Sequence, residues 1–386
     1  MRDLIIYTGN FAEPENNAAG KRVYGNSLIL ESIGYEVLML GKKQNAECVS
    51  KYSEHITFKS YPQYGQIRFD KYMKYLEKII KKKKPVCIVR YGSPCLSIFD
   101  YFLLRYAHRN GIKVVADVVD WLAADGNNIF FNCIKTLDTF LEKALFNSMS
   151  DGIIAISSYL KNYYKNKVSS IVIIPPVVAK YKPNLAKNEN VVVMYAGSPF
   201  RIGSKVKNVH RIKDRLDLVV EAFYGLYKVG VDDFLFKIYG LTKEQYIQAF
   251  PTQAEPIALL NDRIIFYGKK PMNEIQDELS KCDFSILLRE VTRGTSAGFP
   301  TKVVESMSCG TPMITTRTSD LVDYIVNGKN GFFVCIDDLT ELINQLSSII
   351  RLDKGKLKEI KEYCYNNKQF DYTSFSLQMQ YFFNNI

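Results

Sequence analysis

Residues 298–333 bring together the groups that a phosphate and a ribose need from a protein. Gly298 leads into a helix that we expect to begin at about Thr301, and the free N–H groups of a helix N-terminus bind phosphate well. Glu305 lies one turn into this helix, where its carboxylate can accept hydrogen bonds from a vicinal diol such as that of ribose. Gly310 is expected to end the helix before the chain enters a sheet. The stretch therefore predicts a phosphate-and-ribose site at a sheet edge.

A basic stretch precedes a second helix. The strand pattern YAGSP (195–199) ends in Gly197 and Ser198, and cations that follow such a strand can neutralise a diphosphate. For the first three cations of the stretch we favour a solvated charge run. The cations in order are Arg201, Lys205, Lys207, His210, Arg211, Lys213 and Arg215.

Two further strand ends carry residues suited to a nucleotide. The strand RIIFYGKKP ends in Tyr267 and Lys269, which can flank a nucleobase. The strand FSILLRE ends in Arg289 and Glu290, and an arginine can bind a phosphate through two of its nitrogens. An ion pair between Arg289, Glu290 and their neighbours explains the same pattern, and both interpretations stay open.

Strand and helix patterns alternate along the chain, which predicts an α/β protein with parallel sheets covered by helices on both faces. The polar segment Lys180–Asn190 predicts a hinge. We therefore expect Rossmann-like domains over residues 1–180 and 190–366, a final helix over 367–386, and a ligand cleft between the domains beyond the carboxyl ends of the strands. The expected strands are 4–9, 36–41, 86–92, 113–119, 152–157 and 170–175, then 191–197, 235–240, 263–268, 284–290, 312–316 and 332–335.

The composition bounds the class of protein. A chain of 386 residues, 47% hydrophobic, is long enough for two folded domains, and its net charge of +11 favours an anionic partner. The eight cysteines form no CxxC pair, which is typical of a reducing compartment, and with three histidines we expect no metal site. Because no run is long enough to cross a bilayer and no signal peptide opens the chain, we expect a cytoplasmic protein without a cofactor.

Across residues 195–333 the chain resembles the nucleotide-sugar-binding half of GT-B glycosyltransferases, especially the retaining family numbered four. The resemblance implies that Lys213 faces the donor diphosphate. It also implies that Glu305, the second of two glutamates separated by seven residues, holds the ribose. Ala297 stands where the first glutamate, which touches the transferred sugar, is expected, and Glu290 is the candidate to replace it. A retaining, metal-independent transfer is implied, in which the donor phosphate helps to deprotonate the acceptor.

The first half supplies candidates for the acceptor side. Gly20 follows a glycine- and alanine-rich loop at a helix start, from which GT-B enzymes approach the donor phosphates, although a simple structural turn looks the same. Asp120 and Trp121 follow a buried strand. We favour Asp120 as a catalytic residue near the sugar, with a helix N-cap as the equal alternative. Arg90 and Tyr91 end the preceding core strand and are expected to line the acceptor pocket.

Two further segments suggest how the protein binds a membrane and where its final helix packs. Lys71–Lys84 carries seven lysines on a helical pattern with apolar residues, and such basic amphipathic surfaces bind anionic lipid. This suits a lipid-linked acceptor at the inner face of the plasma membrane. A solvent-facing helix with its apolar residues in the core explains the pattern equally. The aromatic segment 370–385 suits the helix that GT-B proteins fold back onto the N-terminal domain, and packing on its own domain is the alternative.

With the resemblance, the sequence predicts a glycosyltransferase that moves a sugar from a nucleoside diphosphate to an acceptor hydroxyl in cell-surface polysaccharide or glycoconjugate assembly. A sugar-nucleotide epimerase and a non-catalytic nucleotide-sugar-binding partner of a membrane assembly are the alternatives, and nucleic acid is not expected as a partner. The catalytic candidates are Asp120, Lys213 and Glu290, and the acceptor-side candidates are Arg90, Tyr91 and Trp121. The donor-binding candidates are Gly20, Gly197, Ser198, Lys213, Tyr267, Lys269, Arg289, Gly298, Thr301, Lys302 and Glu305.

Overall fold

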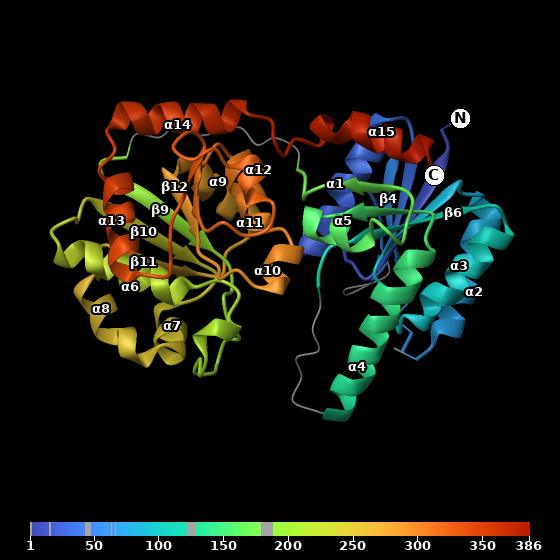
Figure 1. Cartoon of the computed structure of the whole chain (residues 1–386), viewed down its shortest axis with the longest axis horizontal. Helices are drawn as coiled ribbons and strands as arrows, with labels where there is room; N and C mark the ends of the chain where they lie inside the picture. Colours follow the sequence, from blue (N-terminus) through green and yellow to red (C-terminus); the bar gives the residue numbers. More distant parts are fainter. Residues whose placement is uncertain are drawn as a thin grey trace. The chain divides into compact units, whose positions relative to one another are not determined.

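The computed structural model describes residues 2–14, 17–42, 48–62, 64–65, 67–121, 129–178 and 188–386, with the side chains of 129–132 excepted. The chain forms two compact α/β units (Figure 1). The first unit comprises residues 1–179 together with 297–299 and 371–386, and the second comprises 180–296 and 300–370. Of the expected hinge, positions 180–187 lie outside the described residues.

The first unit is built on an eight-stranded sheet in the order β3-β4-β2-β1-β5-β6-β7-β8. Its neighbouring strands are parallel except β3 and β4. The strands are β1 (Leu4–Gly9), β2 (Glu36–Lys42), β3 (Val49–Lys51), β4 (Ile56–Tyr61), β5 (Cys87–Tyr91), β6 (Lys113–Val118), β7 (Gly152–Ala155) and β8 (Ile171–Ile173). Its helices are α1 (Ala18–Ser32), α2 (Phe69–Lys83), α3 (Ile98–Arg109), α4 (Ile129–Leu141), α5 (Ser158–Tyr164) and α15 (Ser376–Asn384).

The second unit contains a six-stranded parallel sheet in the order β11-β10-β9-β12-β13-β14. Helix α6 packs on α8 and α13, and α11 packs on α9 and α14. The strands are β9 (Val191–Ala196), β10 (Phe234–Tyr239), β11 (Ile264–Gly268), β12 (Phe284–Leu287), β13 (Met313–Thr315) and β14 (Gly331–Phe333). The helices are α6 (Leu216–Lys228), α7 (Lys243–Ala249), α8 (Ala254–Leu259), α9 (Met272–Lys281), α10 (Arg293–Ala297), α11 (Thr301–Ser308), α12 (Leu321–Tyr324), α13 (Leu339–Ile350) and α14 (Lys354–Asn366).

The predicted fold class is confirmed, and each expected strand is present, with ends that differ from the expected ones by at most three residues. The sequence analysis missed β3 and β4 and expected only parallel pairing, whereas β3 adds an antiparallel edge. The reason lies in their composition. Thr57 and Lys59 interrupt the apolar pattern of β4, and β3 is a short edge strand with exposed residues.

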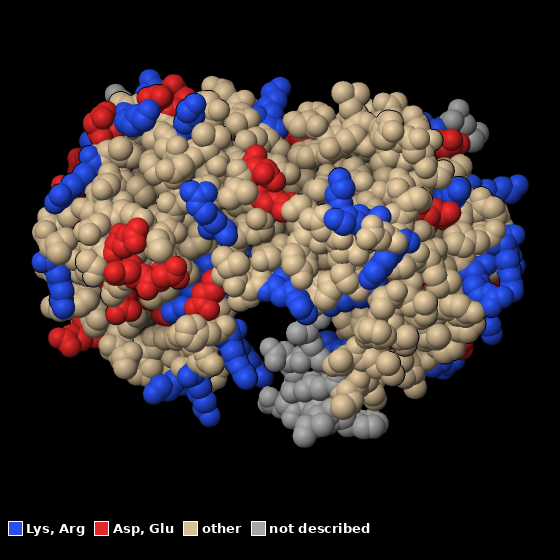
Figure 2. Space-filling view, viewed as in Figure 1, with Lys and Arg blue, Asp and Glu red and all other residues tan. Residues whose placement is uncertain are grey.

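Helix α2 carries the lysine-rich segment. Its Tyr72, Leu76 and Ile80 are buried in the core of the first unit, while its lysines are exposed. Figure 2 shows lysine and arginine side chains along the edge of this unit that carries α2 and α3. The structure thus agrees with the alternative in which the lysine-rich segment is a solvent-facing helix with its apolar residues in the core. Within the described residues, no helix combines the length and the apolar character needed to cross a membrane.

The end of the chain packs within the first unit. Helix α15 contacts α1 and β8. A Cβ at Gly152 would lie 2.6 Å from the ring of Phe382, so the ring rests directly on the backbone of β7. The rings of Tyr35 and Phe383 lie 5.6 Å apart, and the hydroxyls of Ser32 and Ser376 are 2.8 Å apart. Residues 371–386 therefore complete the hydrophobic packing of the first unit.

Candidate functional site

The order of the second sheet changes direction between β9 and β12, because β10 and β11 extend to one side of β9 and β12 returns to the other. Ligands of open α/β sheets bind beyond the carboxyl ends of the strands at such a switch point. At this edge Gly197 follows β9, and Arg289 is the second residue beyond the end of β12. Helix α11 begins at Thr301, as predicted, and Gly310, with φ of 75°, follows its end.

One buried carboxylate, that of Asp214, connects these segments. Its Oδ1 lies 2.7 Å from both Nε and Nη2 of Arg289. Its Oδ2 accepts a hydrogen bond from the Tyr195 hydroxyl at 2.9 Å and another from the ammonium group of Lys302. Burial by itself raises a carboxyl pKa, but Lys302 and Arg289 outweigh burial and lower the pKa of Asp214 to about 2. With Asp214 ionised, these three side chains carry one net positive charge.

Gly197 makes room for Lys302. A Cβ at position 197 would lie 2.3 Å from Nζ and 2.5 Å from Cε of Lys302, and the φ of Gly197 is 154°. The same ammonium donates to the Tyr195 hydroxyl at 3.1 Å and lies 4.6 Å from the centre of that ring. The Lys302 side chain is 25% exposed, against 6% for Asp214, so the lysine is the member of this pair that a ligand can reach. The structure thus brings together Gly197 and Lys302, two of the predicted donor residues.

A second set of ion pairs lies beside the first. Arg215, next in sequence to Asp214, pairs with Glu290, next in sequence to Arg289. Arg215 also donates to Asp217 through Nε at 3.0 Å and Nη2 at 2.8 Å. Two consecutive residues before α6 therefore exchange opposite charges with two consecutive residues after β12. These two ion pairs hold the start of α6 against the end of β12. Arg289 and Glu290 therefore form the internal ion pairs that were one of the two interpretations of their sequence pattern.

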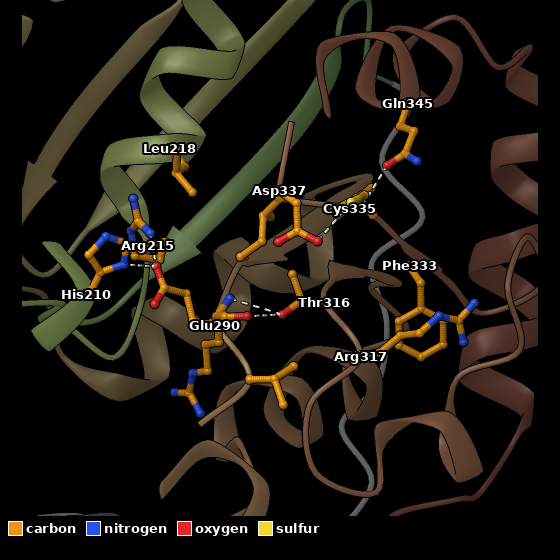
Figure 3. Close-up of a pocket in the computed structure, with 14 residues that line it drawn as sticks. His210, Arg215, Leu218, Glu290, Thr316, Arg317, Phe333, Cys335, Asp337 and Gln345 are labelled. Carbon is orange, nitrogen blue, oxygen red and sulfur yellow. Dashed lines mark hydrogen bonds and ion pairs between the residues drawn. The ribbon is translucent and has the colours of Figure 1, made fainter. Parts of the chain in front are cut away.

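A pocket of about 970 Å³ opens beside these ion pairs (Figure 3). On one side Glu290 lies 2.7 Å from Nδ1 of His210. On another, the Arg317 guanidinium lies over the Phe333 ring, 4.4 Å from its centre. Flat faces next to charged and amide groups suit a ligand that is rich in hydroxyls. The lining residues are His210, Arg215, Leu218, Arg289, Glu290, Val291, Thr316, Arg317, Phe333, Val334, Cys335, Ile336, Asp337 and Gln345.

Lys213 lies outside the cluster that Asp214 forms with Tyr195, Arg289 and Lys302. Its side chain is exposed ahead of α6, whereas the next residue, Asp214, is buried and turns toward Arg289 and Lys302. The cation that the structure brings to the end of β9 therefore comes from α11 and not from the basic stretch. Both lysines were predicted to bind the donor, and the role of each stays a prediction.

Ser198, Tyr267, Lys269 and Glu305 are further predicted donor residues in the second unit, and Glu305 acts electrostatically on Lys302. Ser198 and Lys269 are exposed, and the ring of Tyr267 stacks on that of Tyr239 at 4.6 Å. Glu305 is half-buried on α11, whose apolar neighbours are buried as expected. Gly298 is buried in the loop before this helix. Their roles in donor binding stay predictions.

Arg90 is a correction to the predicted acceptor side. Its side chain is only 1% exposed, and it donates to Asp100 at 2.7 Å and to Asn147 at 2.5 Å. Burial, partly offset by Arg90, raises the pKa of Asp100 to about 7, and burial also raises the pKa of Glu142. The side chain is thus committed to a network in the core, and this placement makes it a structural residue. Tyr91, next along the strand, is half-buried.

Gly20 also has a structural explanation. Its N–H donates to the side chain of Asn17, the N-cap of α1, at 2.7 Å. A Cβ at position 20 would lie 2.4 Å from the carbonyl oxygen of Ala12, so only glycine allows the preceding loop to approach the helix. With its N–H already paired, Gly20 fits the structural turn rather than the predicted phosphate contact.

Asp117 lies in β6 and Asp120 follows it, and the two aspartates have different surroundings. Asp117 is buried and pairs with Arg22 at 2.8 Å, and it accepts from the Tyr7 hydroxyl at 2.5 Å. Asp120 is half-buried beside Trp121, which is itself half-buried. The buried carboxylate of this strand is therefore compensated within the core, while Asp120 stays the catalytic candidate of the first unit.

Sequence reasoning missed Asp214 and Tyr195, the two residues that bind Lys302, and counted Arg215 only as part of the basic stretch. One signal was available, since an aspartate just before an amphipathic helix within a run of cations invites an ion pair. Among the described residues, no group of three or more His, Cys, Asp or Glu side chains could hold a metal ion.

Comparisons with known proteins find similarity to glycosyltransferases, mainly in the second unit. Residues 204–367, most of the second unit, match the family model described as glycosyl transferases group 1. The uncharacterized glycosyltransferase MJ1178 of Methanocaldococcus jannaschii is 25% identical over 223 residues, which are 57% of this chain and 54% of that protein. The putative colanic acid biosynthesis glycosyltransferase WcaL of Salmonella typhimurium is 28% identical over 150 residues, 38% of this chain and 36% of WcaL. The chain therefore matches about half or less of the length of these relatives.

Among solved structures, Alr3699/HepE of Anabaena in complex with UDP and glucose is similar over the whole of both chains, with a TM-score of 0.63 and 13% identity. The second unit thus matches the model of glycosyl transferases group 1, and the chain has the GT-B fold. The predicted resemblance is confirmed at this level. Membership of the family numbered four stays a prediction.

Proposed function

We propose that this protein is a glycosyltransferase that binds a nucleoside diphosphate sugar at the switch point of its second unit and moves the sugar to an acceptor hydroxyl. The observation that carries the proposal is the cluster of Lys302 and Arg289 on Asp214, with one net positive charge at the carboxyl edge of the group 1 domain. A diphosphate carries the complementary charge. The similar fold solved with UDP and glucose supports this chemistry, and WcaL suggests cell-surface polysaccharide assembly as the setting.

In the proposed reaction the acceptor oxygen bonds to C1 of the sugar while the bond from C1 to the donor phosphate breaks. Lys302 and the N–H groups at the start of α11 are suited to stabilise the negative charge of the leaving diphosphate. Because these groups can do the electrostatic work of a metal ion, we propose a metal-independent reaction. By the resemblance we propose retention at C1, with a donor phosphate oxygen taking the acceptor proton on the same face. Glu290, which lines the pocket, is the proposed contact of the transferred sugar.

A thermal-shift screen of UDP-, GDP-, dTDP- and ADP-sugars tests the proposal, because a ligand that binds only the folded chain raises its unfolding temperature. The donor that stabilises the chain is then incubated with sugar and lipid-linked acceptors, with and without EDTA, and the configuration of the product is read by NMR. Glu305→Ala should weaken binding of that donor about tenfold or more, since it removes the carboxylate proposed to accept hydrogen bonds from the ribose hydroxyls. If no nucleotide sugar stabilises the wild-type chain, the proposal is wrong.

A non-catalytic nucleotide-sugar-binding protein is the second candidate. Ala297, a fully buried methyl group, stands where the resemblance implies a sugar-binding carboxylate, and this observation favours the candidate. Donor binding without hydrolysis or transfer, across the acceptor panel, supports it. Conversion of the donor sugar to its epimer in the absence of an acceptor points instead to an epimerase.

For the acceptor we propose a sugar or a lipid-linked sugar, met by a cytoplasmic protein at the inner face of the membrane. The exposed lysines of α2 can attract anionic headgroups, and since the apolar side of this helix lies in the core, the attraction is electrostatic. Binding to vesicles that contain phosphatidylglycerol should therefore fall steeply as salt rises, and salt-independent binding would contradict this part of the proposal.

A further inference from the structure

Lys302 is surrounded by charged and polar groups from four segments. Asp214, ahead of α6, accepts its hydrogen bond, and the hydroxyl of Tyr195 on β9 lies 3.1 Å away. Arg289, after β12, adds a like charge nearby, and Glu305 contributes from the helix of the lysine itself. Burial lowers the pKa of Lys302, and the carboxylate of Asp214 opposes that effect.

Among these groups, Asp214 has the largest effect on the protonation of Lys302. A partly buried ammonium beside an arginine loses its proton more easily unless a carboxylate compensates for the lost water and the like charge. Asp214 is the group that meets both cations directly, with one oxygen on Arg289 and the other on Lys302. Without this carboxylate, two like charges would face each other at the end of β9.

We propose that Asp214 is a positioning residue for donor binding: it holds the Lys302 ammonium charged and aimed beside Gly197, where the donor diphosphate binds. This inference rests on the proposed function and names a residue that neither the resemblance nor the sequence pattern assigned. Asp214 itself does not touch the ligand, because its side chain is 6% exposed and both of its oxygens are occupied by the protein.

The geometry leaves Lys302 within reach of a ligand. A Cβ at Gly197 would overlap the ammonium of Lys302, so the residue that follows β9 leaves space for that group. The lysine side chain is 25% exposed, against 6% for Asp214. The lysine is therefore the member of the pair that a ligand can meet, and Asp214 acts on the ligand through it.

The test measures binding of UDP and of inorganic pyrophosphate by calorimetry between pH 7 and pH 10, at constant ionic strength. In Asp214→Asn the pH at which affinity falls should drop by about 1–3 units relative to the wild type, because Lys302 loses its proton more easily. Affinity should be nearly normal below that pH. Asp283→Asn is the matched control, since Asp283 is a buried aspartate of the same unit that accepts from Asn188 and the Val192 N–H.

Rescue by an arginine makes the test specific. An arginine keeps its charge throughout this pH range, so adding Lys302→Arg to Asp214→Asn should remove the extra pH dependence. If Asp214→Asn does not fold, Tyr195→Phe takes its place. It removes the hydroxyl that bridges Asp214 and Lys302 and should move the midpoint in the same direction by a smaller amount.

A ligand-free measurement distinguishes failure of this inference from failure of the proposed function. The pH dependence of reductive methylation of Lys302, read by mass spectrometry, reports the protonation of its amine. An unchanged labelling midpoint in Asp214→Asn overturns the inference, whatever the donor affinity. If the wild-type chain binds neither a nucleotide nor pyrophosphate, the proposed function and the role of Asp214 in donor binding both fail, while a shifted labelling midpoint still supports the pairing with Lys302.

Discussion

Arg289 holds Asp214 through two guanidinium nitrogens, Nε and Nη2, each 2.7 Å from the same carboxylate oxygen. This two-point grip fixes the orientation of the carboxylate and leaves its second oxygen for Lys302. The sequence suggested a choice for Arg289 between binding phosphate and forming an internal ion pair. In the structure the arginine forms the ion pair, and the more exposed lysine is the group that an incoming anion can meet.

The first prediction compares two lysines. Lys302→Met should raise the dissociation constant of the donor about tenfold or more, since a partly buried charged hydrogen bond to phosphate contributes about 1.5–3 kcal/mol. Lys213→Met should change it by about twofold or less, because that side chain is exposed. Calorimetry with the donor identified by thermal shift decides between them. The opposite ranking would return Lys213 to the diphosphate, as the resemblance implies.

The second prediction concerns the space beside β9. In Gly197→Ala the new methyl group meets the Lys302 ammonium and the backbone is strained, so donor affinity should fall about tenfold or more while the chain stays folded. Gly294→Ala is the control, because its Cβ would meet no atom closer than 3.9 Å. Equal affinity for the two variants would show that the ligand does not approach this end of the strand.

The third prediction is a pH dependence of stability in the first unit. Asp100 has a pKa of about 7 when folded, against 3.8 for an ordinary aspartate, so between these values the folded chain holds a proton that the unfolded chain has lost. The contribution of Asp100 to stability should therefore fall as pH rises from about 4 to about 7. Asp100→Asn should flatten this part of the curve. Urea unfolding followed by fluorescence of Trp121, the single tryptophan, measures it, and an unchanged slope would contradict the assignment.

The fourth prediction concerns the last helix. Phe382→Ala should destabilise the first unit by about 3–5 kcal/mol, because the ring is 3% exposed and its removal leaves a cavity over Gly152. Leu377→Ala, on the same helix but 83% exposed, should stay within about 0.5 kcal/mol of the wild type. The same fluorescence assay measures both variants. Similar losses for the two would mean that α15 does not pack as described.

The sequence predicted the sheets well because strands buried on both faces are continuous apolar runs, as in VVVMYA of β9. It predicted the start of α11 at Thr301 because a proline and a glycine precede the helix there. It missed β4 because Thr57, Lys59 and Ser60 leave neither a continuous apolar run nor a strict alternation. Local composition was therefore enough where burial is uniform along an element.

The partners of Asp214 were beyond sequence reasoning. Arg289 is 75 residues away and Lys302 is 88 residues away, so their meeting depends on the register of three segments at one sheet edge. The resemblance implied a role for Lys213 because of its position ahead of a helix. Lys213 is exposed, whereas the next residue, Asp214, is buried. Likewise, nothing local distinguishes Arg90, which has two partners in the core, from an arginine that lines a pocket.

The return of residues 371–386 to the first unit has a consequence for synthesis. As the chain leaves the ribosome, the eight-stranded sheet is made first, but α15 emerges only after the whole second unit. Until then, the groove beside α1 and β8 that α15 will fill stays open to chaperones or to premature association. The packing of the first unit is therefore completed only after the second unit has been synthesised.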